Sequence, residues 1–514
     1  MQSQNNESSK QVKLGALISY IVIAFNIVAG LIYTPWMISK IGQSNYGLYT
    51  LATSLITLFV VDFGMGAAVS RFVSKYIAEG KQEEINNFLG VVYKLYILID
   101  LLIFIILFVL YFFIDSIYGQ LTGSEIKTFK LLYIVVGLFS VISFPFTNLN
   151  GVLTSYEKFV PLKLCDLFHK AFIIIAMVIA LLFGAGVYVL VLINAIAGIL
   201  TIVIKLIIIR AQTSARINWS YFDKGVIKSI FSFSLWTTVA ALAQRLIYNI
   251  TPSIIAAVSP TGSTGVALFG LGSTIEGYVY SIATAISGMF MPKISRMIYG
   301  EKKEDLTPLM IRVGRIQCMI IGLFLVGFVG LGRSFIADVW RKPDFDISYF
   351  CAMFLIIPSY FYVPMEIANT ALVVENKVKL QAFIFIVMGL TNVVLSLILS
   401  RYFGALGAAI SIFVAYTLRT ILMVVVYQKQ MGLHMWTFYK ETFIKITPWL
   451  LILLVGALAL EYFNPMSASI LRFLVNGCIL VLFYGIIMIV FVWNKSEKKL
   501  FTDVFGKALK KRKR

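Results

Sequence analysis

The sequence predicts an all-α protein that crosses a membrane many times, and three observations support this fold class. The chain of 514 residues is 60% hydrophobic and only 13% charged. Its mean hydropathy of +0.90 lies far above that of ordinary soluble domains. Apolar runs of about 20 residues, each long enough to cross a hydrocarbon core, recur from one end of the chain to the other. Within such a core the backbone must satisfy its own hydrogen bonds, which favours helices.

The apolar runs divide into about 14 candidate transmembrane helices. In chain order they cover residues 14–38, 47–70, 91–113, 131–153, 163–183, 187–209, 229–257, 266–291, 312–332, 348–373, 380–400, 405–427, 442–462 and 470–493. The polar residues before the first run lack the apolar core and cleavage site of a signal peptide, so we expect the first helix to be retained.

The distribution of positive charge predicts how the chain is oriented. If the N-terminus is cytoplasmic, the inner loops and tails collect about 33 of the 44 Lys and Arg residues, and the outer loops collect about eight. This excess predicts that both termini are cytoplasmic. No nucleic-acid-binding module is visible, so the net charge of +20 is assigned to membrane orientation and no nucleic-acid partner is expected.

Four pairs of segments repeat at an offset of about 220 residues, which predicts an internal duplication. In the longest pair, residues 46–81 and 267–302, each copy has one carboxylate in an apolar run and a basic end. The other pairs are Thr34–Pro35 with Thr251–Pro252, 150–158 with 369–377, and 184–186 with 404–407. Because each copy holds an even number of helices, both enter the membrane from the same side and form parallel repeats.

The predicted domain organisation follows from this duplication. It consists of a cytoplasmic N-terminal tail (1–13), an N-lobe of six helices (14–210), a cytoplasmic linker (211–228), a C-lobe of six helices (229–427), two extra C-terminal helices (442–493) and a basic cytoplasmic tail (494–514). Two parallel lobes of this kind predict a transporter with a pathway between them.

Polar residues within apolar runs are costly, so each is a candidate functional residue. Arg245 and Glu276 lie near the middle of consecutive predicted helices. Two interpretations are open. They form an ion pair that holds the helices together, or Arg245 binds an anionic substrate with Glu276 as its counter-charge or as a proton site. Gln244 and Asn249 add hydrogen-bonding groups beside Arg245.

Other charged residues in the apolar runs also have two interpretations each. Arg419 either extends to the cytoplasmic interface or acts as a second cation of the cavity. Asp100 has no basic neighbour in sequence, which would suit proton coupling. Asp62 is a candidate ion-coupling residue, although we favour a local structural role for it. His169 is interpreted as interfacial.

Prolines interrupt several predicted helices. Pro35 and Pro252 occupy matching positions in the two repeats, and Pro364 lies in the run at residues 348–373. They are candidate hinges for opening the transport pathway, or ordinary kinks of membrane helices.

The sequence predicts no metal site and no cofactor. The four cysteines show no metal-binding spacing, and the chain has only two histidines.

Three segments carry a family resemblance: IGQSNYGLYTL (41–51), VVDFGMGAAVSRFVSKY (60–76) and LNGVLTSYEKFVPLKL (149–164). With the arrangement of six, six and two helices, they make the chain similar to bacterial oligosaccharide–lipid flippases. These form the polysaccharide-export branch of the superfamily that includes multidrug-and-toxin extrusion pumps and the lipid II flippase. The resemblance implies a V-shaped, two-lobed transporter with a cationic cavity. It would move undecaprenyl-diphosphate-linked sugar units from the inner to the outer leaflet by alternating access coupled to H⁺ or Na⁺.

The same resemblance implies partners and a location. The protein would lie in the bacterial cytoplasmic membrane, would not be an enzyme, and would serve the biosynthesis of surface polysaccharides such as O-antigen. Its expected partners are the lipid-linked oligosaccharide, membrane lipids, and polysaccharide polymerase or chain-length machinery. Arg245 and Arg419 would hold the diphosphate, because a guanidinium donates two parallel hydrogen bonds to phosphate.

Three alternative functions are open. An ion-coupled multidrug exporter would fit twelve helices better than fourteen. Lipid II flippases carry an arginine in the first helix, where this chain has Asn26 as its only strongly polar residue. A membrane polysaccharide polymerase or glycosyltransferase would need a larger outer loop than the short outer loops predicted here.

Overall fold

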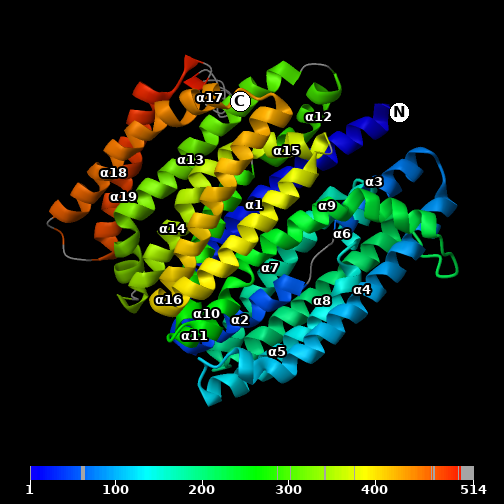
Figure 1. Ribbon diagram of the computed structural model, residues 1–514, viewed down its shortest axis with the longest axis horizontal. Coiled ribbons are helices and arrows are strands. Elements are labelled where there is room, and N and C mark those ends of the chain that lie inside the picture. The colour runs from blue at the N-terminus through cyan, green and yellow to red at the C-terminus, as the bar shows by residue number, and fades with distance from the viewer. Residues whose placement is uncertain are drawn as a thin grey trace, which may run out of the picture. The chain divides into compact units, whose positions relative to one another are not determined.

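The computed structural model describes residues 2–59, 64–285, 287–300, 303–340, 343–375, 377–464, 466, 469–495 and 497–498. Over these ranges the regular elements are all helices and no β-strand is present (Figure 1). The predicted all-α fold class is therefore confirmed. Eleven of the described helices are long and apolar enough to cross a membrane, or twelve if one bent pair is counted as a single span. The count of fourteen stays a prediction.

The longest helix, α16 (Val378–Met431), contains two of the predicted transmembrane helices and folds back on itself. Its helical geometry is broken only at Gly404, where φ is 58° and ψ is −135°. This left-handed conformation favours glycine, because a Cβ atom would strain it. The Arg419 guanidinium lies 4.8 Å from the centre of the Phe385 ring, so the two legs of α16 lie beside each other.

The second predicted helix, residues 47–70, overlaps two helices of the structure. These are α2 (Gln43–Phe59) and α3 (Met65–Ala78). Asp62 falls between them, outside the described residues. Its predicted role in ion coupling stays a prediction.

The chain divides into two compact units, of which unit 1 comprises residues Met1–Ser273 and Val378–Arg419. Besides α2, α3 and most of α16, its helices are α1 (Gln2–Ile41), α4 (Gln82–Ile117), α5 (Gly123–Ser143), α6 (Leu149–Ser155), α7 (Phe159–Leu182), α8 (Val187–Gln212), α9 (Lys224–Tyr248), α10 (Thr251–Val258) and the first part of α11 (Gly262–Thr284). Within it, α7 packs against α1 and α8, and α5 packs against α2, α4 and α8. Unit 1 thus holds the predicted N-lobe together with part of the predicted C-lobe, and the lobe boundaries stay a prediction.

A proline shapes the region of unit 1 that follows α5. The helix begins with a capping box in which the Thr122 and Glu125 side chains bond each other's backbone N–H groups. It ends at Ser143, where Pro145 forms a single 3₁₀ turn before α6 begins. Proline lacks an N–H group and cannot continue the helical hydrogen bonds. After this break, the side chains of Thr147 and Asn150 line a pocket together with residues of α7 and α8.

Unit 2 comprises residues Thr274–Lys377 and Thr420–Arg514. Its helices are the end of α11, α12 (Met291–Tyr299), α13 (Leu306–Ser334), α14 (Asp346–Tyr362), α15 (Glu366–Val374), the end of α16, α17 (Met435–Tyr439), α18 (Lys445–Phe463) and α19 (Ile470–Ile487). Short π-helical turns follow α13, α17 and α19. The central helix is α13, which packs against α14, α18 and α19.

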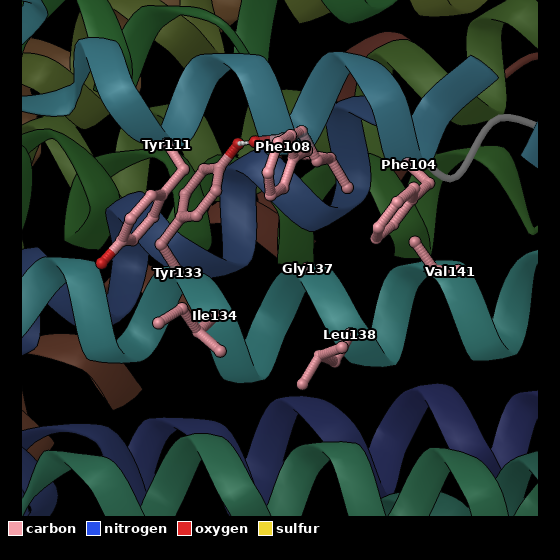
Figure 2. Close-up of a pocket in the computed structure, with 9 residues that line it drawn as sticks. Phe104, Phe108, Tyr111, Tyr133, Ile134, Gly137, Leu138 and Val141 are labelled. Carbon is pink, nitrogen blue, oxygen red and sulfur yellow. Dashed lines mark hydrogen bonds between the residues drawn. The ribbon is translucent and has the colours of Figure 1, made fainter. Parts of the chain in front are cut away.

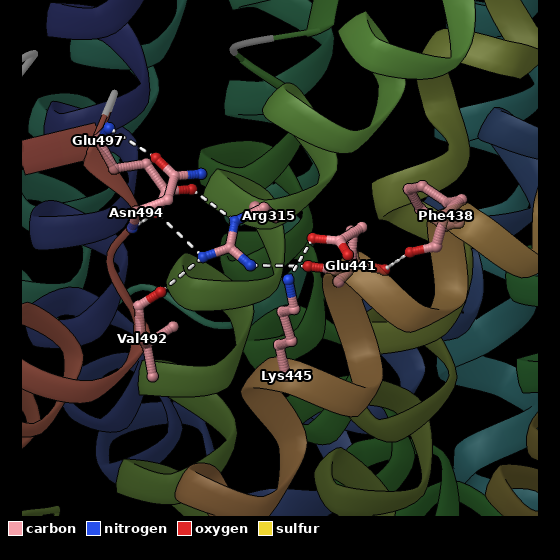
Figure 3. Close-up of polar contacts among 8 residues, drawn as sticks. Arg315, Phe438, Glu441, Lys445, Val492, Asn494 and Glu497 are labelled. Atoms are coloured by element: carbon pink, nitrogen blue, oxygen red, sulfur yellow. Dashed lines mark hydrogen bonds and ion pairs between the residues drawn. The ribbon is translucent and has the colours of Figure 1, made fainter.

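A buried arginine of α13 ties the C-terminal helices of unit 2 together (Figure 3). Arg315 donates from Nε to Glu497 Oε1 at 2.6 Å and from Nη2 to Glu497 Oε2 at 3.0 Å. It also donates to the carbonyl oxygens of Glu441 and Val492, each at 2.7 Å. We call this group of four residues the Arg315 anchor. It joins α13 to the π-helical turn before α18 and to the chain at the end of the π-helical turn that follows α19.

The three candidate hinge prolines lie in different local structures. Pro35 lies inside α1, Pro252 lies in the first turn of α10, and Pro364 lies in the 3₁₀ turn between α14 and α15. Pro252 and Pro364 thus mark breaks between helices, whereas α1 continues through Pro35. Their role as hinges stays a prediction.

Candidate functional site

Arg245 lies near the end of α9, in unit 1. Its side chain is half-buried, and Nη1 donates to the Thr57 carbonyl of α2 at 2.6 Å. Gln244 is exposed, and Asn249 is half-buried just beyond the last turn of α9. A guanidinium has five N–H donors, so one contact with a carbonyl leaves Arg245 able to bind an anion as well.

Arg419 is buried in the second leg of α16, with only 5% of its surface exposed. Its guanidinium lies over two rings, 4.8 Å from the centre of Phe385 and 5.8 Å from that of Tyr416. Aromatic faces stabilise a cation that is removed from water. Arg419 is therefore held within the protein. Its two interpretations, a second cation of the cavity or a side chain that extends to the cytoplasmic interface, stay predictions.

Both legs of α16 pack against α9, the helix that carries Arg245. Asn392, in the first leg, donates to the Leu246 carbonyl at 3.0 Å and to Thr251 Oγ1 at 3.1 Å. In the second leg, the ring of Tyr416 lies 6.0 Å from that of Tyr248. The structure thus places the two candidate arginines on one packed group of helices.

The candidate carboxylates lie in different surroundings. Asp100 of α4 is half-buried, and its Oδ1 has no hydrogen-bond partner among the described residues. Glu276 belongs to unit 2, has only 5% of its surface exposed, and accepts a hydrogen bond from Ser359 Oγ at 2.9 Å. An unpaired carboxylate oxygen in an apolar span suits proton binding better than a satisfied one. The two interpretations of Arg245 and Glu276 stay predictions.

A cavity of about 250 Å³ in unit 1 gathers polar residues, of which the sequence analysis singled out only His169. Its polar lining consists of Ser143, Thr147, Asn150, Asp166, His169, Thr201 and Lys205. We call it the Lys205 pocket. Lys205 donates to Asn150 Oδ1 at 2.9 Å, and its Nζ lies 3.6 Å from Asp166 Oδ1. His169, interpreted from the sequence as interfacial, lines this cavity. The only sequence signal was the spacing of Asp166 and His169, one turn apart on α7.

A second cavity, of about 280 Å³, lies between α4 and α5 and is apolar (Figure 2). Phe104, Phe108 and Tyr111 of α4 face Gly137 and Leu138 of α5 across it. The hydroxyl of Tyr133, another lining residue, is occupied by a hydrogen bond to the Leu107 carbonyl at 2.9 Å. Such a lining accommodates hydrocarbon better than it accommodates a sugar or a phosphate.

Three polar side chains join helices of the two predicted lobes within unit 1, at their predicted outer ends. Glu125 Oε1 of α5 accepts a hydrogen bond from Ser44 of α2 at 2.5 Å and another from Ser263 of α11. The hydroxyl oxygens of Ser44 and Ser263 lie 3.0 Å apart. We call Ser44, Glu125 and Ser263 the outer serine contact.

Gly47 makes this close approach of α2 and α11 sterically feasible. A Cβ atom at Gly47 would lie 1.8 Å from the Ser263 carbonyl oxygen. We expect Gly47→Ala to push the helices apart and to speed the labelling of Ser44→Cys by a membrane-impermeant maleimide. Gly277→Ala is the control, because a Cβ atom there meets nothing within 4 Å. An unchanged labelling rate in Gly47→Ala would show that the helices are already separated in the membrane.

No group of three metal-ligating side chains is present among the residues that the structure describes.

The sequence of this chain matches known proteins over most of its length. Residues 13–299, more than half of the chain, match the family of polysaccharide biosynthesis proteins. An uncharacterized membrane protein of Methanocaldococcus jannaschii is 22% identical over 405 residues, which cover 76% of this chain and 92% of the relative.

Solved structures share the fold at low sequence identity. The lipid II flippase MurJ in an inward closed conformation aligns with a TM-score of 0.72 and 16% identity, over 95% of this chain and 99% of that chain. A multidrug resistance transporter in an inward-facing conformation gives 0.64 and 15% identity, over 81% and 98% of the two chains. A transporter of the same superfamily from Pyrococcus furiosus gives 0.59 and 14% identity, over 83% and 95%.

The structural likeness establishes the fold, and the sequence match establishes the family. The chain is a multi-pass membrane protein, and it has the helical fold of the MurJ and multidrug transporter structures. The chain belongs to the family of polysaccharide biosynthesis proteins.

Proposed function

We propose that the protein is a flippase that moves undecaprenyl-diphosphate-linked oligosaccharides from the inner to the outer leaflet of the bacterial cytoplasmic membrane. It is not an enzyme, its termini are cytoplasmic, and it supplies surface polysaccharide biosynthesis. The family and the flippase-like fold support this proposal. The observation that carries it is the placement of Arg245 and Arg419 on one packed group of membrane helices in unit 1.

Two arginines within apolar helices match the chemistry of a diphosphate. A guanidinium stays charged inside a protein and donates paired hydrogen bonds to phosphate oxygens. The same two charges would repel a cationic drug, so they favour an anionic substrate over the multidrug alternative. In this proposal the sugars cross in a hydrated pathway while the polyprenyl chain stays in the lipid.

Transport proceeds by alternating access, coupled to H⁺ or Na⁺. Two structures with this fold are described as inward closed and inward-facing. The outer serine contact would close the predicted outer side of this chain in the same kind of state. Asp100 is a candidate proton site because its Oδ1 is unpaired, and moving one charge across the membrane supplies about 2.3 kcal/mol per 100 mV.

The proposal is tested by complementing a strain that lacks its own flippase. Arg245→Ala is expected to lower surface polysaccharide about tenfold or more, because a hydrogen bond to a charged group contributes about 1.5–3 kcal/mol. Arg419→Ala is expected to act in the same direction. Arg401→Ala is the matched control, since Arg401 is exposed at the turn of α16.

The variants must first be shown to be inserted and abundant by immunoblotting of membranes. Full export by Arg245→Ala would contradict the phosphate role. Restored export in the double variant Arg245→Ala, Glu276→Ala would instead identify a structural ion pair. A purified protein that fails to move the lipid-linked oligosaccharide in proteoliposomes would contradict the flippase function itself.

A further inference from the structure

The Lys205 pocket holds a positive charge of the chain itself, between α7, α8 and the break after α5. The Lys205 side chain has only 12% of its surface exposed. Its ammonium donates to Asn150 Oδ1 at 2.9 Å and lies 3.6 Å from Asp166 Oδ1. A charge in this position is costly unless it has partners, and an amide oxygen and a carboxylate supply them.

Besides Asn150, Asp166 and the imidazole of His169, the pocket is lined by three hydroxyl groups. Each of its three hydroxyl groups donates its proton to a backbone carbonyl of a nearby residue: Ser143 to Ser140 at 3.2 Å, Thr147 to Phe144 at 2.8 Å, and Thr201 to Ala197 at 2.7 Å. A hydroxyl has one proton and two lone pairs. With the proton so engaged, each oxygen is left as a hydrogen-bond acceptor.

A set of one carboxylate, one amide oxygen and several hydroxyl oxygens is the ligand type that hard cations prefer. It is poorly suited to an anion, which the Asp166 carboxylate would repel. Lys163 is the second partner of Asp166, with Nζ 3.3 Å from Oδ2. The Lys163 side chain is 37% exposed and is not part of the lining, so its interaction with Asp166 is better screened by water.

We propose that Lys205 is a tethered cation that occupies an oxygen-lined cation site in unit 1. The natural pocket then holds the ammonium of Lys205 in place of an exchangeable Na⁺. Removing that ammonium turns the pocket into a site for a monovalent cation. This inference goes beyond the proposed function, because it concerns which cation this pocket accepts and does not depend on the lipid that is transported.

The charge balance of the pocket gives the reason. Without the Lys205 ammonium, the more exposed Lys163 is the remaining ion-pair partner of Asp166 among the described residues. Lys170 adds an electrostatic interaction with Asp166 from beyond ion-pair distance. A half-buried carboxylate with too little positive charge beside it attracts a cation from solution. The space left by the ammonium, next to the oxygens of Asn150 and Asp166, is where that cation would bind.

The experiment uses the full-length protein in lipid nanodiscs. Thermal unfolding of the natural protein and of Lys205→Ala is followed as NaCl replaces choline chloride at constant ionic strength. We expect Na⁺ to raise the unfolding midpoint of Lys205→Ala by a few degrees in a saturable manner, and to leave that of the natural protein unchanged. Lys205→Arg keeps the charge and should behave as the natural protein does.

Two further variants test the location of the site. Lys163→Ala is the matched control, and we expect no response to Na⁺, because Lys205 still fills the pocket. Asp166→Asn combined with Lys205→Ala should lose the response, because the carboxylate ligand is gone. Lys205→Met keeps much of the apolar stem of the side chain and repeats the test if alanine leaves a cavity that weakens folding.

Several results would overturn the proposal. A folded Lys205→Ala or Lys205→Met that does not respond to Na⁺ would show that the pocket binds no free cation. Variants that fail to fold whether or not Na⁺ is present would show the same, since an external cation should replace the ammonium. A natural protein stabilised by Na⁺ through Asp166, or by inorganic phosphate through Lys205, would identify a different ligand.

Discussion

A disulfide between Ser44→Cys and Ser263→Cys is expected to abolish export, and a reducing agent is expected to restore it. The hydroxyl oxygens of these serines lie 3.0 Å apart, so cysteine sulfurs at the two positions come within bonding reach. The bond would join α2 to α11 and hold the outer serine contact closed. If the transport cycle opens this side, the cross-linked protein cannot complete a cycle.

The experiment needs a protein with no other reactive thiol on its surface. Of the four native cysteines, Cys478 is exposed and the other three are buried, so Cys478→Ser is the background. Each single cysteine variant is treated with the same oxidant as a control. Export that continues in a fully cross-linked protein would mean that α2 and α11 stay together throughout transport.

Replacing Arg315 is expected to have the largest effect on stability. Arg315→Met removes one side of a buried ion pair and leaves the Glu497 carboxylate, whose side chain is 9% exposed, without its partner. Breaking such a pair destabilises a protein by about 3–5 kcal/mol. Two carbonyl groups, those of Glu441 and Val492, also lose their donor.

The loss of stability in Arg315→Met should be confined to unit 2. In Arg315→Met we expect the end of α19 to separate from α13 and to be cut by protease well before the natural protein is. Arg312→Met is the matched control, because Arg312 lies one turn away on the same helix and is exposed. Equal cleavage rates in the two variants would show that the Arg315 anchor does not hold the C-terminal helices.

The sequence predicts those features of the fold that depend on a repeated pattern. Runs of apolar residues predict membrane helices, among them the two parts of α16, and the turn at Gly404 between them falls in one of the repeated pairs. Arg245 and Arg419 were recognised because a charge in the middle of an apolar run stands out. The fold likeness to flippases agrees with the resemblance carried by short motifs.

Other parts of the site could not be predicted, because they depend on partners far apart in the chain. Lys205 and Arg315 lie near predicted inner helix ends, where a basic side chain normally reaches water. Only the tertiary structure shows that Lys205 pairs with Asp166 and that Arg315 pairs with Glu497. The outer serine contact joins two serines to the glutamate of a predicted loop, and no pattern in the sequence distinguishes these residues.

The turn of α16 has a consequence for how the chain enters the membrane during synthesis. A single non-helical residue, Gly404, separates the two legs of α16. The legs are not joined by a loop long enough for one of them to stay in water while the other crosses the membrane. We therefore expect the legs to insert as one hairpin. Arg419 would then enter the bilayer beside the ring of Phe385 and not as an isolated charge.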